Sequence, residues 1–412
     1  MKHKVLISFA SSSVLLSIAQ LVANVLVIRW VLPAELGIWH TVVVLKSYAL
    51  ILNLGTSNGL NRELPFLLGK SHRRFARATA QSALFVSLLA AVFSFAIFGS
   101  GAAIVEDVNV KLSLFVVAIV SALTFVNMYY GTTFRTNQAF YVFSKINVAL
   151  IAIELLTLVL PAVYNFQGFL FRLVMIEVLK LGLFLKLQPF PVKPKFRWLP
   201  FKFLVATGIP LFVSAYVSAI TDTLKRVILK GAASFEMVGL FAPALAVYSL
   251  NSILPQTLGR YIFPKLSHGI GQGQSIRALW MKNFKFSLFS VALLAPAVVV
   301  GYFLAPAAIE ILFPNYLVGT RATQIAIISG LFTPFALLMN FFHATKHWTS
   351  IYTLAAIKLS LFFALQWLFV REMPPLTGIA TGALIAQVIF AAVIVAYGFY
   401  YVARSPEVNG VT

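Results

Sequence analysis

Apolar residues follow one another along this chain in long runs, separated by short breaks that carry charged residues, glycine or proline. A membrane-spanning helix needs about 20 apolar residues, and the runs have this length. The pattern therefore predicts an all-α polytopic membrane protein with twelve transmembrane helices. We place these helices at 5–28, 36–60, 78–99, 112–134, 143–163, 168–187, 203–226, 238–259, 284–305, 322–345, 349–370 and 376–401.

Composition excludes a soluble enzyme. Of the 412 residues, 60% are hydrophobic and 10% are charged, whereas a soluble domain carries about 25% charged residues. The first run, 5–28, exceeds the 7 to 15 residue core of a cleaved signal peptide, so we expect a membrane helix there. Cysteine is absent, and disulfides and thiol chemistry are therefore excluded.

The basic residues indicate an orientation. If the N-terminus is cytoplasmic, 21 of the 32 Lys and Arg residues lie at cytoplasmic ends and loops, and six lie outside, among them Arg172. The positive-inside rule then places both termini in the cytoplasm, and the expected location is the cell (inner) membrane. The net charge of +21 is explained by lipid headgroups at the cytoplasmic surface, so we expect no nucleic-acid partner.

A proline-rich segment divides the predicted helices six and six. Residues 189–200 contain four prolines and no apolar run, which is typical of a semi-rigid linker. The two flanking segments, 1–188 and 201–412, share weak similarity at an offset of 201, as in Arg29 with Lys230. We predict an N-terminal lobe, a cytoplasmic linker and a C-terminal lobe, with the lobes related by a pseudo-two-fold axis along the membrane normal.

Two predicted helices carry matching stripes of polar residues at steps of 4, 3 and 4. Such spacing places all members of a stripe on one helix face. Small polar residues can serve close helix packing, or they can line a water-filled cavity between the lobes. The predicted cavity-lining residues are Ser13, Ser17, Gln20 and Asn24 on the first helix, and Ser214, Ser218 and Thr221, followed by Lys225, on the seventh.

We place eight ionisable residues of the predicted helices near the membrane centre, where an ionised side chain costs about 3 kcal/mol or more. Glu177 and Lys180 stand at i and i+3 and can satisfy each other. Asp222 has two cations one turn later. The complete set is Lys46, Glu154, Glu177, Lys180, Asp222, Lys225, Arg226 and Lys358.

Four short segments, in their order along the chain, resemble a known family. They are IRWVLPAELGIW (28–39), GTSNGLNRELP (55–65), EMVGLF (236–241) and FPNYLVG (313–319). Together they resemble the polysaccharide-transporter branch of the multidrug/oligosaccharidyl-lipid/polysaccharide (MOP) exporter superfamily, which includes the Wzx-type flippases. The resemblance implies two six-helix lobes and alternating access. It also implies that the substrate is an undecaprenyl-diphosphate-linked oligosaccharide, such as an O-antigen or lipopolysaccharide repeat unit.

The sign of the intramembrane charge supports this branch. Five cations against three carboxylates suit a diphosphate headgroup, whereas an exporter of lipophilic cations would show the reverse excess. Lys46 shares a predicted helix face with Asn53 and Ser57. The predicted substrate-binding residues are Lys46, Asn53, Lys225, Arg226 and Lys358.

Coupling to an ion gradient needs a group that binds the ion differently in the two access states. Glu154 is the first candidate because no cation lies near it in its own predicted helix, and Asp222 is the second. The alternative for Glu154 is a structural pair with Lys46 or Lys180 of another helix.

Two other functions remain open. A multidrug exporter of the same superfamily is one. A membrane-embedded polysaccharide polymerase or ligase is the other, but it would need acid, base or nucleophile groups outside the membrane. The predicted external loops offer only scattered carboxylates and no histidine. We expect no catalytic residue, cofactor or metal, and a monomer whose partners are its substrate, membrane lipids and other polysaccharide assembly proteins.

Overall fold

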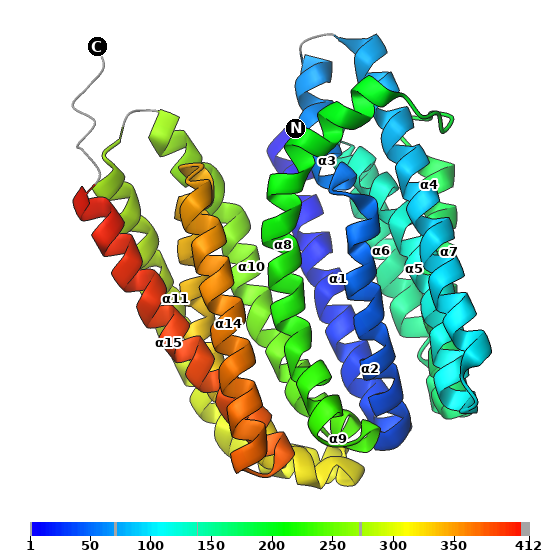
Figure 1. Cartoon of the computed structure of the whole chain (residues 1–412), viewed down its shortest axis with the longest axis vertical. Coiled ribbons are helices and arrows are strands. Elements are labelled where there is room, and N and C mark those ends of the chain that lie inside the picture. Colours follow the sequence, from blue (N-terminus) through cyan, green and yellow to red (C-terminus); the bar gives the residue numbers. More distant parts are fainter. Residues whose placement is uncertain (1, 70–71, 138, 272–273, 405–412) are drawn as a thin grey trace. The chain divides into compact units, whose positions relative to one another are not determined.

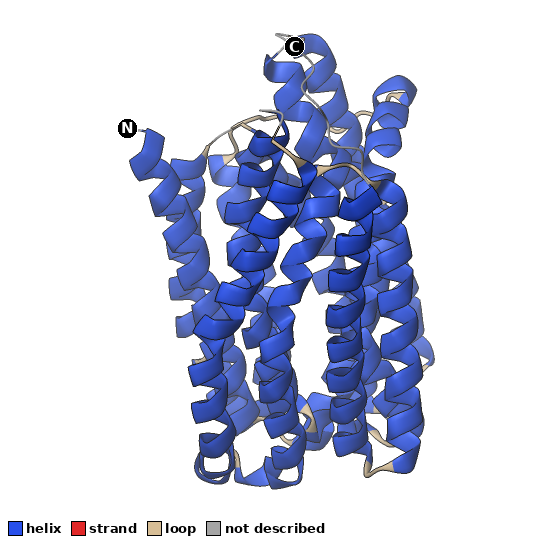
Figure 2. Cartoon of the chain, turned by 90° about the vertical axis from the view of Figure 1, so that its left-hand side faces the viewer, coloured by secondary structure: helices blue, strands red, loops and turns tan. Residues whose placement is uncertain are grey.

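The computed structural model describes residues 2–69, 72–137, 139–271 and 274–404, with the side chains at 2–7, 10, 69, 214, 254, 257, 260–261, 264–265, 267–269 and 271 left out. Every regular element in the described part is a helix (Figure 2). The chain forms two compact units, Met1–Ile220 (unit 1) and Thr221–Thr412 (unit 2). The predicted all-α class is confirmed.

Unit 1 contains the first seven long helices and the first half of an eighth (Figure 1). Its elements are α1 (Lys2–Trp30), α2 (Pro33–Ala49), the 3-10 helix η1 (Leu50–Asn53), α3 (Thr56–Gly69), α4 (Arg73–Ile104), α5 (Val108–Thr136), α6 (Phe140–Leu156), α7 (Val159–Leu187) and the start of α8 (Trp198–Ala232).

Local sequence explains where several of these helices begin. Pro33 occupies the first turn of α2, where its missing N–H is not needed. The Asp107 carboxylate accepts a hydrogen bond from the Val110 amide at 2.9 Å and caps α5. Residues 188–197 lie in no helix, and the Ser82 hydroxyl of α4 accepts from the Arg197 amide at 3.1 Å. The proline-rich segment is therefore held against α4.

The apolar core of unit 1 lies among α3, α4, α5, α6 and α7. Phe134 and Tyr129 of α5 are fully buried there, and Phe184 of α7 contacts Phe134 with ring centroids 5.3 Å apart. Helix α4 packs along α5, and α1 packs along α6. This core holds the helices that carry the polar residues described below.

The predicted second helix, 36–60, is wrong in one respect, because the chain breaks it into α2, η1 and α3. Leu54 and Gly55 have φ of 51° and 70°, the left-handed region that ends a helix. A Cβ at Gly55 would lie 2.8 Å from the backbone of Gly208 in α8. The backbones of Gly55 and Gly208 approach each other so closely that both positions require glycine.

The predicted fifth and sixth helices also have different bounds. They form the pair α6 and α7, which is bent by 84°. Asn165 has φ 47° and ψ −124° within the range of α7. The bend places the middle of α7 beside the end of α6.

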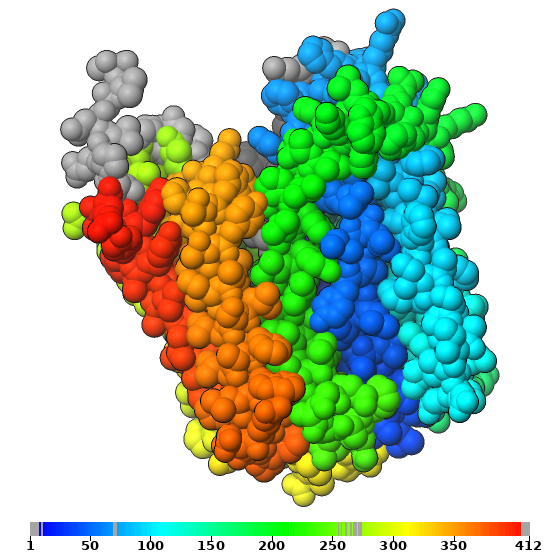
Figure 3. Space-filling model, in the orientation of Figure 1, coloured from blue at the N-terminus to red at the C-terminus, as the bar shows by residue number. Residues whose placement is uncertain are grey.

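Unit 2 contains α9 (Phe235–Leu240), α10 (Ala242–Gly271), α11 (Ile276–Leu312), η2 (Pro314–Gly319), α12 (Thr320–Ser329), η3 (Gly330–Leu338), α13 (Met339–Ala344), α14 (Trp348–Glu372) and α15 (Pro375–Arg404). Its core surrounds the fully buried Trp280 and Phe342. Helices α14 and α15 pack along each other, and Figure 3 shows them as orange and red neighbours at the surface of this unit. The predicted helix 322–345 is divided among α12, η3 and α13.

Each of the twelve predicted segments is helical. In the described part, nine spans are long and apolar enough to cross a membrane by themselves, and α6 with α7 qualifies as a bent pair. The remaining predicted segment is α10, which carries Asn251 and Gln256 among its apolar residues. These helices confirm a multi-pass membrane architecture.

Candidate functional site

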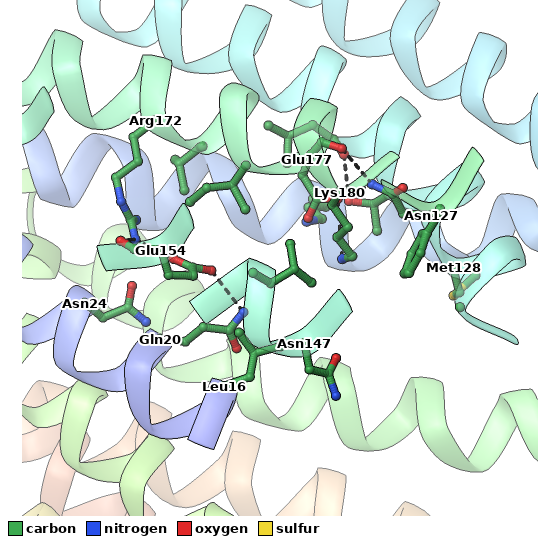
Figure 4. Close-up of a pocket in the computed structure, with 18 of the residues that line it drawn as sticks. Leu16, Gln20, Asn24, Asn127, Met128, Asn147, Glu154, Arg172, Glu177 and Lys180 are labelled. Carbon is green, nitrogen blue, oxygen red and sulfur yellow. Dashed lines mark hydrogen bonds and ion pairs between the residues drawn. The ribbon is translucent and has the colours of Figure 1, made fainter. Parts of the chain in front are cut away.

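Unit 1 encloses a cavity of about 630 Å³ between α1, α2, α5, α6 and α7 (Figure 4). Four cations, two carboxylates and several amides line its wall. The polar lining residues are Gln20, Asn24, Lys46, Thr124, Asn127, Arg135, Asn147, Glu154, Arg172, Glu177 and Lys180. Most of the polar residues predicted within the N-terminal helices therefore meet at one place.

Glu154 on α6 is the centre of the first polar cluster. Its Oε2 accepts a hydrogen bond from Arg172 Nη2 at 2.5 Å, and its Oε1 accepts from Gln20 Nε2 at 3.1 Å. Arg172 also donates to the Glu154 carbonyl oxygen at 3.1 Å. Both charged side chains are buried, with 7% of Glu154 and 2% of Arg172 exposed. This cluster joins α1, α6 and α7.

The sequence did not identify the partner of Glu154. We expected Arg172 outside the membrane and named Lys46 or Lys180 as a possible partner of Glu154, but Arg172 is the partner. The reason is the bend between α6 and α7 together with the break at Asn165, which return the chain so that position 172 lies beside position 154. No spacing rule within one helix could show a pair that depends on this bend.

Glu177 on α7 is the centre of the second cluster. Lys180 Nζ lies 3.6 Å from Glu177 Oε2, which confirms the predicted i, i+3 pair. Asn127 of α5 donates to the same carboxylate oxygen at 2.6 Å and to the Glu177 carbonyl at 3.0 Å. The Lys46 ammonium is attracted by Glu177 and repelled by Lys180. Sequence analysis did not identify Asn127, although an amide in an apolar helix is a signal for such a role.

The polar stripe on α1 serves two purposes along its length. Ser13 accepts a hydrogen bond from Asn147 of α6 at 3.1 Å, and Ser17 donates to the Ser13 carbonyl at 3.0 Å. Gln20 and Asn24 instead line the cavity. Ser13 therefore contributes to the contact between α1 and α6, Ser17 bonds within its own helix, and the amides face the cavity.

Asn53 has a structural role in this conformation. Its Oδ1 accepts hydrogen bonds from the Ser57 amide at 2.9 Å and the Thr56 hydroxyl at 3.0 Å, and only 2% of the residue is exposed. It thereby caps the start of α3. The predicted face shared by Lys46, Asn53 and Ser57 does not exist, because the chain breaks at 54–55.

Unit 2 holds a second group of cations. Lys225 on α8 is buried and its ammonium lies 4.6 Å from the centre of the Tyr248 ring. Asp222 attracts both Lys225 and Arg226, and Lys358 repels Lys225. The Lys358 ammonium lies 5.7 Å and 5.9 Å from the ring centres of two buried phenylalanines, Phe362 and Phe390. Lys225 and Arg226 thus share one exposed carboxylate, and Lys358 adds a third cation beside them.

The other predicted residues of α8 are less informative. Thr221 is buried and Ser218 is exposed, and both have interactions within the molecule. The side chain of Ser214 lies outside the described residues.

Solved structures provide the comparison with known proteins. The inward-facing conformation of a multidrug resistance MATE family transporter of the MOP superfamily matches with a TM-score of 0.80, at 14% identity over 95% of this chain and 98% of that one. The chain has the MATE transporter fold. An outward-facing conformation of such a transporter matches with a TM-score of 0.68, at 14% identity over 97% and 96% of the chains.

A third match is a MOP superfamily transporter from Pyrococcus furiosus, described as having a binding pocket of reversed polarity that suggests a different function. Its TM-score is 0.66, at 14% identity over 97% of this chain and 96% of that one. No family model and no curated protein matches the sequence. The likeness to the MATE transporters therefore concerns the fold.

Proposed function

We propose that this protein is a MOP superfamily transporter of the flippase type, which moves an undecaprenyl-diphosphate-linked oligosaccharide from the inner to the outer leaflet by alternating access. One observation carries the proposal: cations outnumber carboxylates among the ionisable residues that we place near the membrane centre. With Arg172 included, six cations face three carboxylates. The cations are Lys46, Arg172, Lys180, Lys225, Arg226 and Lys358, and the carboxylates are Glu154, Glu177 and Asp222.

Pairing within unit 1 identifies where the surplus lies. Arg172 and Lys180 form ion pairs with Glu154 and Glu177, which leaves Lys46. Among the described residues, no carboxylate oxygen lies within 4.0 Å of the Lys46 ammonium. In unit 2 the surplus is on Lys225, Arg226 and Lys358, and Asp222 attracts the first two. These are the four cations that we propose as the diphosphate-binding residues.

An uncompensated cation within a membrane costs about 3 kcal/mol or more. A diphosphate diester carries two negative charges and many acceptor oxygens, so it can offset this cost by charge-assisted hydrogen bonds. A lipophilic cation would increase the cost. The surplus therefore favours an anionic substrate over a cationic drug.

A multidrug exporter is the second candidate, and the MATE-like fold favours it. The same fold also includes the Pyrococcus furiosus transporter whose pocket polarity is described as reversed. Fold alone thus permits both substrate classes, and the sign of the charge in the membrane is the observation that separates them.

We assign ion coupling to Glu154 first and to Asp222 second. Glu154 is held by one cation and one amide from two other helices. A proton on its carboxyl would remove the attraction for Arg172 and loosen α7 from α6. Coupling requires that the proton affinity of this carboxyl differ between the access states, and a loosened contact between α6 and α7 would produce such a difference.

The test is transport of a fluorescent polyprenyl-diphosphate-linked glycan across proteoliposome membranes. Lys46→Ala and Lys358→Ala are each expected to lower the rate about 10-fold or more, the equivalent of a lost hydrogen bond to a charged group. Lys111→Ala, at the exposed start of α5, is the matched control and should transport normally. Normal transport by both the Lys46 and Lys358 variants would refute the charge argument.

A parallel measurement separates the two candidate functions. A strain that lacks this protein should lose surface polysaccharide and keep its drug resistance if the protein is a flippase. The reverse result would favour the multidrug exporter.

A further inference from the structure

The cavity of unit 1 is lined by more polar and aromatic side chains than the binding of a diphosphate requires. Both of its carboxylates are paired with cations and are also hydrogen-bonded by amides. These side chains are therefore fixed in place, and their combined charge is small. Beyond Lys46 and Arg135, the wall offers a dense set of directional hydrogen-bonding groups on a rigid frame.

Uncharged polar groups also line the cavity of unit 1. Asn24 is exposed to the cavity, and Figure 4 shows it beside Glu154 and Gln20 on α1. Thr124 and Asn147 also line the cavity. Amides and hydroxyls both donate and accept hydrogen bonds. The ligand groups that match this mixture are hydroxyls and acetamides, which also do both.

One acceptor at the cavity wall is unused. Asn127 donates twice to Glu177, so its Nδ2 is committed. Its Oδ1 is buried and has no hydrogen-bond partner among the residues that the structure describes. A buried acceptor without a donor costs about 1 to 3 kcal/mol. A donor supplied by a ligand would remove that cost.

Aromatic rings complete the lining. Trp39 of α2, Phe143 of α6 and Phe184 of α7 face the cavity, and the centroids of the two phenylalanine rings are 6.0 Å apart. Flat apolar surfaces beside directional polar groups suit a ligand with a hydroxyl-bearing rim and apolar C–H faces. A sugar ring has this form. The volume of about 630 Å³ lies within the usual range of about 300 to 1,000 Å³ for small-molecule sites.

We propose that the cavity of unit 1 is a glycan site, which binds a sugar ring of the substrate through Asn24, Asn127 and Trp39 while Lys46 on the same wall binds the adjoining diphosphate. This inference rests on the proposed function, because it assumes a glycan on a diphosphate lipid. It assigns sugar recognition to one unit and to named residues. It also explains why paired charges and amides accompany Lys46 in the cavity.

The experiment compares two probes that carry the same two charges. One is a short-chain prenyl diphosphate that ends in a single N-acetylhexosamine, and the other ends in a methyl ester. Binding is measured to the full chain in nanodiscs. The wild type should bind the sugar probe at least 10-fold more tightly than the methyl probe.

Asn24→Leu tests the site without removing a hydrogen bond that holds the fold, since Asn24 is exposed to the cavity. It should weaken binding of the sugar probe by about 2- to 10-fold, the equivalent of one hydrogen bond, and leave the methyl probe unchanged. Asn109→Leu, near the start of α5 and outside the cavity lining, is the matched control. Lys46→Gln should weaken both probes.

The outcomes separate the two proposals. Equal affinity of the wild type for both probes, or an Asn24→Leu variant that binds both as the wild type does, would overturn the glycan site. Binding that still depends on Lys46 would then leave the proposed function standing. If neither probe binds, both proposals fail.

Discussion

The buried pair between Glu154 and Arg172 allows a quantitative test of the structure. Replacing Arg172 by methionine removes the cation and keeps most of the side-chain volume. The Glu154 carboxylate, of which 7% is exposed, would then lack its ion-pair partner. Loss of one partner from a buried pair costs about 3 to 5 kcal/mol. We expect the free energy of unfolding to fall by this amount.

Reversible unfolding in mixed micelles measures this free energy. The double variant Glu154→Gln with Arg172→Met should recover much of the loss, because neither charge then remains buried alone. The two single variants and the double variant form a cycle that gives the coupling energy. A cost below about 1 kcal/mol for Arg172→Met would contradict the buried pair, as would a double variant less stable than both single ones.

Lys180→Met is the matched control. Lys180 also pairs with a carboxylate that lines the cavity, but at 3.6 Å and with 31% of its side chain exposed. Solvent screens such a pair, and exposed pairs contribute about 0 to 1 kcal/mol. The chemical change is similar in Arg172→Met and Lys180→Met. The difference between their free energies of unfolding therefore measures the effect of burial on the ion pair.

Three further predictions concern coupling, helix packing and the helix break. Glu154→Gln should abolish substrate-dependent proton or sodium flux in proteoliposomes, and gradient-sensitive transport at the wild-type rate would remove Glu154 from the coupling mechanism. Asn147→Leu removes hydrogen bonds to Ser12 and Ser13. Since such bonds average about 0.6 kcal/mol each, the free energy of unfolding should fall by about 1 kcal/mol. An unchanged unfolding midpoint would argue against the α1–α6 contact. Gly208→Ala would place a Cβ against the Gly55 carbonyl oxygen and should cost about 1 to 3 kcal/mol, whereas Gly182→Ala, with open space around it, should be neutral in the same unfolding measurement.

Hydropathy predicted the helices because a membrane span must be apolar over its whole length, and such a span is a run of consecutive residues in the sequence. It could not predict the breaks within them. Leu54 and Asn165 adopt positive φ, yet neither is a glycine, and the apolar runs continue on both sides. Such conformations are set by tertiary packing, as in the approach of Gly55 to Gly208. The bounds of α2, α3, α6 and α7 therefore depended on contacts that a single run of sequence does not contain.

Pairing between charges was predictable only within one helix. The distance between Glu177 and Lys180 follows from helical geometry, and the structure has this pair. The pair between Glu154 and Arg172 depends on the bend between two helices, so the sequence named the carboxylate and missed the cation. Periodicity has the same limit for α1. It places Ser13 and Gln20 on one helix face, but it does not show that Ser13 contacts α6 while Gln20 lines the cavity.

The sign of the net intramembrane charge does not depend on these errors in pairing, because a sum of charges is the same whichever residues form ion pairs. Counting Arg172 among the intramembrane residues adds a cation, and this cation forms an ion pair with Glu154. The uncompensated cations remain Lys46 and the group in unit 2, the same residues that the sequence selected. A misplaced pair changes the local geometry, and the excess of cations over carboxylates keeps its sign. The argument for an anionic substrate therefore rests on a quantity that is less sensitive to packing than any single contact, and testing Lys46 and Lys358 examines it directly.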